Sequence, residues 1–581
     1  MTGACSSEKK EVKIRLKGTA ASEGIGIGKI LLIEEVSLAY TPHPVEDPAA
    51  EKARFHAAVA TFIEDTKEKM EALKQSAGEK EALIMQGHIS MIEDPYLQGE
   101  TEKRIDGGEC AEAALEAICD MFIGMFSAVE DEMMRQRAAD VRDVKSGVLA
   151  TLLGVHEVKV SDAPKGTVLL AKELTPSVTA GINKENIVGI ITETGGKTSH
   201  SAILARALEI PAVLSVPDAV SLMKNGDTVI VDGGKGDVIP APDADTLLSY
   251  TEKRDTFLRE KRELEAFRGK PTRGADGVEY ELVCNIGKPA DATRVVECDG
   301  EGVGLFRTEF LFMDRTAVPT EEEQFEAYKK AALILKGKPL IIRTLDIGGD
   351  KDIPYLGLEK EENPFMGFRA IRYCLKHREL FKTQLRAILR ASAFGDIRIM
   401  FPLITCVEEL RAGKALVEEC KAELRLTSST PFNENIPVGI MVETAAAAVL
   451  ADALAKESDF FSIGTNDLTG YTMACDRGNA DVAYLYSALQ PSVLRMIEKT
   501  IVSGRAAGIP VGMCGEAAAN PQLIPLLISF GMTEFSVSAP SVLRVRKEIA
   551  RWSKAEADQI AEHAMSLATE EEVAAYLDSI V

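Results

Sequence analysis

The C-terminal half of the chain carries the pattern that most restricts its fold, an alternation of short apolar segments with longer helical ones. Strand candidates begin near Tyr280, Val303, Leu340, Ile397, Val438, Phe460, Val511 and Phe535. Strands that alternate with helices pair in parallel, and eight of them close into a (β/α)8 barrel. A barrel is therefore predicted over residues 271–581.

Polar side chains come directly after several of these strand candidates. The residues in question are Arg307, Arg343, Glu443, Asn466, Asp467 and Cys514. Each alone has a structural explanation, because arginines often form ion pairs and a buried cysteine often acts as a small hydrophobe. Catalytic groups of barrels gather at the C-terminal ends of the strands, so their succession predicts one site.

These residue types fit a small ligand that carries phosphate and carboxylate. Arginine binds both anions through two parallel hydrogen bonds. The predicted clamp consists of Arg307, Arg343, Arg369 and Arg477. Glu443 and Asp467 are predicted to hold a divalent ion, Mg2+, which uses few protein carboxylates. Cys514 lies where a proton donor or acceptor for a substrate carbon is needed.

A second motif surrounds His200 in the N-terminal half. The β-branched run 187–191 leads to Gly195-Gly196, and residues 201–207 favour a helix, so His200 is predicted at a helix N-terminus. Free amides and the positive dipole end attract an anion there, Thr198 adds a hydroxyl donor, and neutral imidazole is a nucleophile. The motif indicates a phosphorylatable histidine, the alternative being a capping loop with an incidental histidine.

The rest of the N-terminal half predicts an α/β domain that a helical bundle interrupts. Strand candidates occupy 13–16, 24–33, 167–170, 187–191 and 228–232, whereas 48–153 has helical periodicity. Periodic residues are expected on one buried face, among them Phe55, Ala58, Phe62, Met121, Phe122, Met125, Phe126 and Val129. The predicted boundaries are 1–45 and 156–243 for the α/β domain, 46–155 for the bundle, 244–270 for a linker helix and 271–581 for the barrel.

Composition limits the partners. The 581 residues include 67 basic and 90 acidic side chains, a net charge of −23, which disfavours nucleic acid and anionic membranes and favours a basic protein partner. Ten cysteines lack metal-binding spacing, so we expect free thiols and a cytoplasmic location. No apolar run has the length of a membrane span.

The motifs together resemble the enzyme I family of the bacterial phosphotransferase system, the phosphoenolpyruvate-protein phosphotransferases. The resemblance covers both halves of the chain. It rests on GGKTSHSAILAR around His200, AADVRD at 138–143, GVGLFRTEFLFMDR at 302–315, RTLDIGGDK at 343–351, ENPFMGFRAIR at 362–372, ASAFGDIRIMFP at 391–402, SIGTNDLTGYTMACDRGN at 462–479 and GMCGE at 512–516.

The resemblance implies an activity. The barrel would bind phosphoenolpyruvate and Mg2+, and the phosphoryl group would pass to His200 and then to a histidine of the phosphocarrier protein HPr. Arg307, Arg343, Arg369, Arg477 and Asn466 would hold substrate, Glu443 and Asp467 the metal, and Cys514 would protonate the enolpyruvate carbon.

It also implies an organisation. The α/β part would be the phosphohistidine domain, the inserted bundle would dock HPr, and the barrel would form a homodimer. Thr179, Lys197 and Thr198 would support the histidine, while His88 and Arg137 are candidates for HPr docking. Many relatives have arginine at the position of Lys197. The lysine keeps the positive charge but lacks the two-pronged guanidinium group.

Three alternatives compete with this interpretation. Pyruvate-phosphate dikinases and phosphoenolpyruvate synthases share the motifs but place a large nucleotide-binding domain ahead of them. A non-catalytic regulator would keep the fold without needing the catalytic residues, but every proposed catalytic residue is present in this chain. A Ser199-His200 hydrolase pair is disfavoured because adjacent helical residues point apart.

Overall fold

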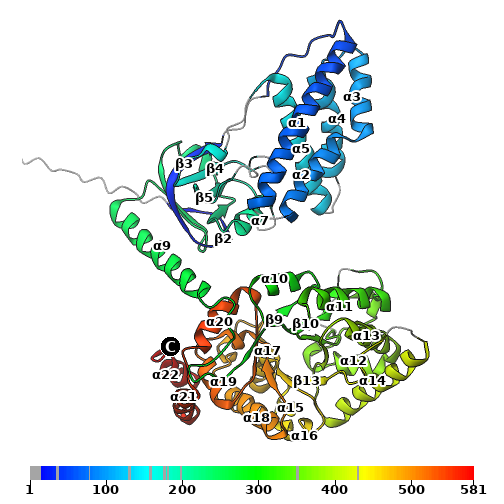
Figure 1. Cartoon of the computed structure of the whole chain (residues 1–581). Helices are drawn as coiled ribbons and strands as arrows, with labels where there is room; N and C mark the ends of the chain where they lie inside the picture. The colour runs from blue at the N-terminus through cyan, green and yellow to red at the C-terminus, as the bar shows by residue number, and fades with distance from the viewer. Residues whose placement is uncertain are drawn as a thin grey trace, which may run out of the picture. The chain divides into compact units, whose positions relative to one another are not determined.

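A computed structural model describes most of the chain as two compact units, Met1–Lys261 and Arg262–Val581 (Figure 1). The residues described are 15–33, 38–76, 79–128, 132–155, 160–174, 178, 182–196, 199–313, 315–348, 353–427 and 431–581. The boundary between the units falls inside helix α9, Ala244–Glu265.

The first unit contains a mixed eight-stranded sheet in the order β1-β8-β7-β3-β4-β5-β6-β2. Its strands are β1 (Leu16–Lys17), β2 (Thr19–Ser22), β3 (Ile25–Ile33), β4 (Thr167–Ala171), β5 (Ile187–Thr192), β6 (Ala212–Leu214), β7 (Thr228–Asp232) and β8 (Asp237–Pro240). Strands β3, β4, β5 and β6 pair in parallel, and β7 joins β3 antiparallel. The chain thus leaves the sheet after β3 and returns to it at β4, the neighbouring strand.

Helices fill the sequence between β3 and β4, as predicted. The helices described there are α1 (Pro48–Ser76), α2 (Glu79–Ile92), α3 (Pro95–Asp106), α4 (Ala111–Ser127) and α5 (Glu132–Leu153). Phe55 and Phe62 are buried among them. Met121 and Met125 are not, since their exposed fractions are 40% and 58%, so the prediction was wrong for these two residues of α4. Phe122 and Phe126, predicted on the same face, are partly buried against the core, and Val129 lies outside the described residues.

The second unit is a closed barrel of eight parallel strands, which confirms the predicted fold class. Its strands are β9 (Glu281–Ile286), β10 (Val303–Arg307), β11 (Leu340–Arg343), β12 (Ile397–Phe401), β13 (Val438–Val442), β14 (Phe461–Ile463), β15 (Val511–Met513) and β16 (Glu534–Val537). Each begins within one residue of its predicted start. β16 pairs with β9 and closes the barrel.

Helices surround these strands (Figure 1). They are α10 (Asp291–Glu297), α11 (Glu321–Leu335), α12 (Ile371–Lys376), α13 (Arg378–Ala391), α14 (Val407–Thr427), α15 (Ala445–Val449), α16 (Ala451–Leu454), α17 (Thr465–Met473), α18 (Pro491–Ala507), α19 (Ile524–Phe530), α20 (Val542–Ile549), α21 (Lys554–Ser566) and α22 (Glu570–Asp578). Buried apolar side chains between strands and helices form the main core of the unit. Among the described residues no helix is both long enough and apolar enough to cross a bilayer.

Successive side chains along each strand point alternately outward, into this core, and inward, into the barrel. Phe535 packs outward with its ring 5.9 Å from that of Tyr280, while Ser536 donates inward to Asn285 Oδ1 at 2.7 Å. A separate interior cluster includes Leu305, Ile341, Met400, Met441, Phe460 and Cys514. Side chains of one parity thus fill the barrel in layers, and those at the strand ends meet at its two mouths.

Candidate active site

Arg343 lies at the C-terminal mouth of the barrel between two carboxylates. It ends β11 in register with Arg307 at the end of β10. Its guanidinium is 2.7 Å from Glu309 and 2.9 Å from Asp346, and all three residues are buried. Arg343 Nε and Glu309 Oε2 are buried with no hydrogen-bond partner in the described part of the chain. A buried donor left without a partner is costly, so this mouth is suited to receive a polar ligand.

Arg369 is held at the same mouth by a loop that precedes α12. Its Nη2 is 2.8 Å from Asp346 Oδ1 and 3.3 Å from Asp467 Oδ2. Its Nη1 donates to the Tyr471 hydroxyl at 3.5 Å. Asp346 therefore binds two arginines at once and fixes both cations in one orientation. Sequence reasoning assigned Asp346 no role, although it stands three residues after Arg343 in the same motif.

Three carboxylates converge beside these arginines. Asp346, Glu443 and Asp467 each offer an oxygen, and these oxygens lie within 4.8 Å of one another. Glu443 follows β13 and accepts a hydrogen bond from the Leu403 amide at 2.7 Å. Burial and the nearby Asp467 and Asp346 raise the pKa of Glu443 to about 8. A divalent cation would relieve this repulsion, so the residues present fit a metal ion, with Glu443 and Asp467 less engaged by arginine than Asp346.

Two glycines provide the space for these carboxylates. A Cβ at Gly464, after β14, would lie 2.9 Å from both Cβ and Oε2 of Glu443. A Cβ at Gly515, after β15, would lie 1.6 Å from Thr465 Oγ1. Thr465 is the first residue of α17, which carries Asn466 and Asp467. Both glycines are required by close approach at the site.

Cys514 lies buried at the end of β15 as a neutral thiol. Its Sγ donates to the Ile463 carbonyl at 3.6 Å. Burial raises the pKa of the Cys514 thiol to about 11, against the opposing influence of Ser462 and Arg343. The group therefore keeps its proton at neutral pH and is suited to donate it.

The remaining barrel candidates lie nearer the solvent. Arg307 and Asn466 are half-buried, and the Asn466 carbonyl accepts a hydrogen bond from the Tyr486 hydroxyl at 3.0 Å. Arg477 is exposed. Burial raises the pKa of Tyr486, and the charge of nearby Arg477 opposes this rise. Tyr486 therefore lies between Arg477 and the start of α17.

His200 is the first residue of α7 (His200–Ala207), as predicted. Ser199 is the N-cap, and its hydroxyl accepts from the Ala202 amide at 3.3 Å. Gly195, with φ of +102°, makes the turn between β5 and this cap. Thr179, Lys197 and Thr198 lie outside the described residues. The backbone around His200 therefore presents the start of a helix, the position suited to an anion.

His88 and Arg137, the docking candidates, differ in exposure. Arg137 is exposed on α5. The His88 side chain is 2% exposed, with Nε2 3.7 Å from Asp140 Oδ1 and Nδ1 3.7 Å from Asp143 Oδ2. In this structure the imidazole joins α2 to α5 inside the bundle and does not reach the surface.

Comparisons with known proteins cover nearly the whole chain. Residues 261–554 match the family model of the PEP-utilising enzyme, PEP-binding domain; residues 17–137 match PEP-utilising enzyme, N-terminal; and residues 163–236 match PEP-utilising enzyme, mobile domain.

Curated relatives carry one name. The phosphoenolpyruvate-protein phosphotransferase of Bacillus sp. (strain S) is 47% identical over 567 residues, covering 97% of this chain and 97% of that protein. The protein of that name from Bacillus subtilis (strain 168) is 46% identical and covers 97% of this chain and 99% of its own length. Among solved structures, the Enzyme I (nEIt) protein determined by NMR is 36% identical and covers 42% of this chain and 99% of that chain, with a TM-score of 0.38.

Proposed function

Since the chain belongs to the family of the phosphoenolpyruvate-protein phosphotransferases, we propose that it transfers the phosphoryl group of phosphoenolpyruvate to its own His200. A histidine of HPr then receives the group, and pyruvate is released. The observation that carries the proposal is the barrel mouth, where two buried arginines face three convergent carboxylates near a neutral thiol.

Phosphoenolpyruvate carries a phosphate and a carboxylate, and the mouth offers cations for both. Arg343 and Arg369 are held rigidly by Asp346, so little side-chain entropy is lost when substrate binds. Arg307, Asn466 and Arg477 border the mouth and complete the clamp in this proposal. Glu443 and Asp467 would hold Mg2+, which when bound offsets the negative charge of the phosphoryl group.

The proton of Cys514 completes the first half-reaction. The bond between phosphorus and the enol oxygen breaks, and phosphorus bonds to an imidazole nitrogen of His200. The enolate carbon takes the thiol proton and becomes the methyl group of pyruvate, after which solvent reprotonates the thiolate. With its pKa at about 11, the thiol holds this proton in reserve across the physiological pH range.

The second half-reaction needs a separate encounter. His200 belongs to the first unit and the barrel to the second, so the histidine must reach the barrel mouth to be loaded and leave it to meet HPr. We propose that Arg137, exposed on α5, contributes to docking, with His88 supporting the helices from inside. Lys197, Thr198 and Thr179 would support the phosphorylated imidazole.

The setting of the reaction follows the same family. We propose a cytoplasmic enzyme that forms a homodimer through the barrel, and a role at the entry of phosphotransferase-system sugar uptake or its regulation. In support of a reducing compartment, the nine cysteines of the described residues are free thiols.

Peptide mapping of acid-labile label tests donor, nucleophile and acceptor together. The chain is incubated with labelled phosphoenolpyruvate and Mg2+, with and without HPr. We expect label on the peptide that contains His200, its transfer to HPr, and its loss in His200→Ala. Undiminished label in His200→Ala, on another residue, would reject the nucleophile.

A further inference from the structure

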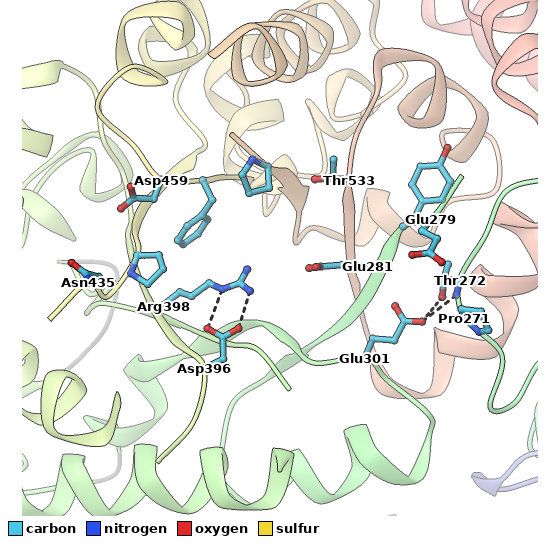
Figure 2. A pocket seen from close by; sticks show the side chains of 14 residues that line it. Pro271, Thr272, Glu279, Glu281, Glu301, Asp396, Arg398, Asn435, Asp459 and Thr533 are labelled. Carbon is cyan, nitrogen blue, oxygen red and sulfur yellow. Dashed lines mark hydrogen bonds and ion pairs between the residues drawn. The ribbon is translucent and has the colours of Figure 1, made fainter. Parts of the chain in front are cut away.

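A cavity opens at the mouth of the barrel opposite the phosphotransfer site, where the strands begin. Its volume is about 800 Å3, within the range of small-molecule sites. Figure 2 shows the side chains around it. They are Pro271, Thr272, Glu279, Tyr280, Glu281, Glu301, Asp396, Arg398, Asn435, Pro437, Asp459, Phe460, Pro510 and Thr533. None of them belongs to the phosphotransfer site.

The lining is strongly acidic, with five carboxylates and one guanidinium. Several of the acids already have partners. Asp396 is 2.9 Å from Arg398, Glu279 pairs with Arg273, and Glu301 accepts from the Thr272 hydroxyl at 2.8 Å. The Glu281 carboxylate points into the cavity toward Arg398 (Figure 2), and no hydrogen bond or ion pair of this carboxylate is found among the described residues.

Glu534 does not line the cavity itself but lies next to Glu281, which does. It begins β16 and is directly paired in register with Glu281 of β9. Phe535 faces outward, so Glu534 faces the barrel interior at the level of Glu281 and Arg398. The residue is 6% exposed, yet within the described part of the chain its carboxyl has no hydrogen-bond donor. Burial and the neighbouring Glu281 raise the pKa of Glu534 to about 7, against the influence of Arg398.

The arrangement of the acids fits an organic cation better than a metal ion. The carboxylates of this mouth form no convergent group like that of Asp346, Glu443 and Asp467 within the described residues. Pro271, Pro437, Pro510 and Phe460 separate them with apolar surface. Methylene groups fit such surface, and ammonium groups fit the carboxylates at its edges.

We propose that this cavity binds a small aliphatic amine with at least two ammonium groups. One ammonium lies between Glu281 and Glu534, and a second reaches Asp459 and Asn435 across the prolines. The site is separate from the phosphotransfer site, at the other end of the same barrel.

Titration calorimetry of the full chain with spermidine, and with butylamine as a singly charged control, tests the proposal. We expect saturable binding of spermidine with a stoichiometry of one, at least tenfold tighter than butylamine. Because part of the Glu534 population is protonated at neutral pH, binding releases protons, which calorimetry in buffers of different ionisation enthalpy detects. Glu534→Gln and Glu281→Gln each weaken binding at least tenfold. Glu297→Gln leaves it unchanged, because this exposed carboxylate pairs with Arg294 and does not line the cavity.

Three results would overturn the proposal: no saturable heat with spermidine, equal affinity in the Glu534→Gln and Glu297→Gln variants, or displacement of spermidine by Mg2+ no less effectively than by the diamine putrescine. Glutamine has nearly the shape of glutamate, and the folding of each variant is checked by urea unfolding followed through the fluorescence of Trp552, the single tryptophan of the chain. Since neither measurement depends on phosphotransfer, a failure here leaves the proposed phosphotransfer unaffected, and the reverse also holds.

Discussion

Asp346 shows how one carboxylate organises a charged site. It contacts both Arg343 and Arg369, and it also lies within reach of Glu443 and Asp467. Without it, two buried guanidiniums would lose a counter-charge and the freedom of both side chains would increase. The charges of the mouth are thus interdependent, and the effects of single substitutions there are not expected to add.

Replacing Asp346 with asparagine tests this dependence. We expect a loss of stability of about 3 kcal/mol, because breaking a buried ion pair leaves an uncompensated charge. The chain has a single tryptophan, Trp552 in the barrel unit, so its fluorescence during urea unfolding reports on the barrel. Asp396→Asn is the matched control, since its partially exposed pair with Arg398 is worth at most about 1 kcal/mol. Equal losses in the two variants would contradict the role of Asp346.

A neutral Cys514 makes a prediction about both reactivity and turnover. Alkylation of Cys514 by iodoacetamide, followed by mass spectrometry of its peptide, should accelerate toward pH 11 with no plateau between pH 7 and 9, because the thiolate is the nucleophile. Cys514→Ala should lower turnover by at least about a hundredfold while phosphoenolpyruvate binding stays within about threefold. If the variant loses binding and folding together, the thiol is structural.

The buried Glu534 predicts a pH dependence of barrel stability in amine-free buffer. Its folded-state pKa, about 7 and raised chiefly by burial and Glu281 with Arg398 opposing, exceeds the unfolded value. The carboxyl therefore contributes stability at low pH that is lost as pH rises through 7. Relative to Glu534→Gln, the natural chain should lose up to about 3 kcal/mol between pH 5 and pH 8, measured by Trp552 fluorescence. If the difference in unfolding free energy between the two chains stays constant from pH 5 to pH 8, the pKa of Glu534 is not raised.

At the scale of elements, the start of α17 is set by the neighbouring strand ends. Thr465 and Asn466 follow β14 so closely that Gly515, after β15, has no room for a side chain. Strand β14, helix α17 and the turn after β15 therefore form one close-packed unit around the proposed metal ligands. A change in any of the three is expected to move Asp467.

The variant Gly515→Ala tests whether the glycine is needed because a side chain would collide with Thr465, and not because of backbone flexibility. The added Cβ displaces Thr465 and with it Asp467, so we expect Mn2+ affinity, measured by paramagnetic resonance, to fall at least about tenfold and stability to fall by about 1–3 kcal/mol. The double variant Gly515→Ala, Thr465→Ala removes the colliding hydroxyl and should recover part of the affinity.

The control lies in the same helix. Gly470→Ala in α17 has Cys475 O as its nearest neighbour at 3.3 Å, and alanine favours a helix by up to about 1 kcal/mol. Its Mn2+ affinity should be unchanged. A loss as large as that of Gly515→Ala would point to helix flexibility in place of steric clearance.

The whole molecule divides the proposed reaction between two units. His200 lies in the first and the arginine-rich mouth in the second, with α9 spanning the division. The covalent link keeps the histidine at a high local concentration relative to the mouth. Each half-reaction should then require only one unit, whereas the full reaction requires both.

Fragments that divide at the end of α9 test this. Residues 1–264 should exchange phosphate with phospho-HPr but not with phosphoenolpyruvate, and residues 265–581 should bind phosphoenolpyruvate without transferring its phosphate to HPr. Mixed at micromolar concentration, the two should transfer at least about a hundredfold more slowly than the intact chain, because the effective concentration of linked groups is millimolar. Labelling of residues 1–264 by phosphoenolpyruvate alone would refute this division.

The amino-acid sequence alone was sufficient to predict the barrel strands and the helical start at His200, because both depend on local periodicity and on turn residues. It was not sufficient for β2, β6 and β8, which are only three or four residues long. β2 pairs with β6, and β8 pairs with β1, across long stretches of the chain. Three further features could not be predicted from the sequence: the contacts of Asp346 with two arginines, the burial of His88, and the pairing of Glu281 with Glu534. Each of these joins residues that come together only when elements pack or the barrel closes, and that long-range geometry, together with the desolvation it imposes on charges, is decided by the tertiary structure.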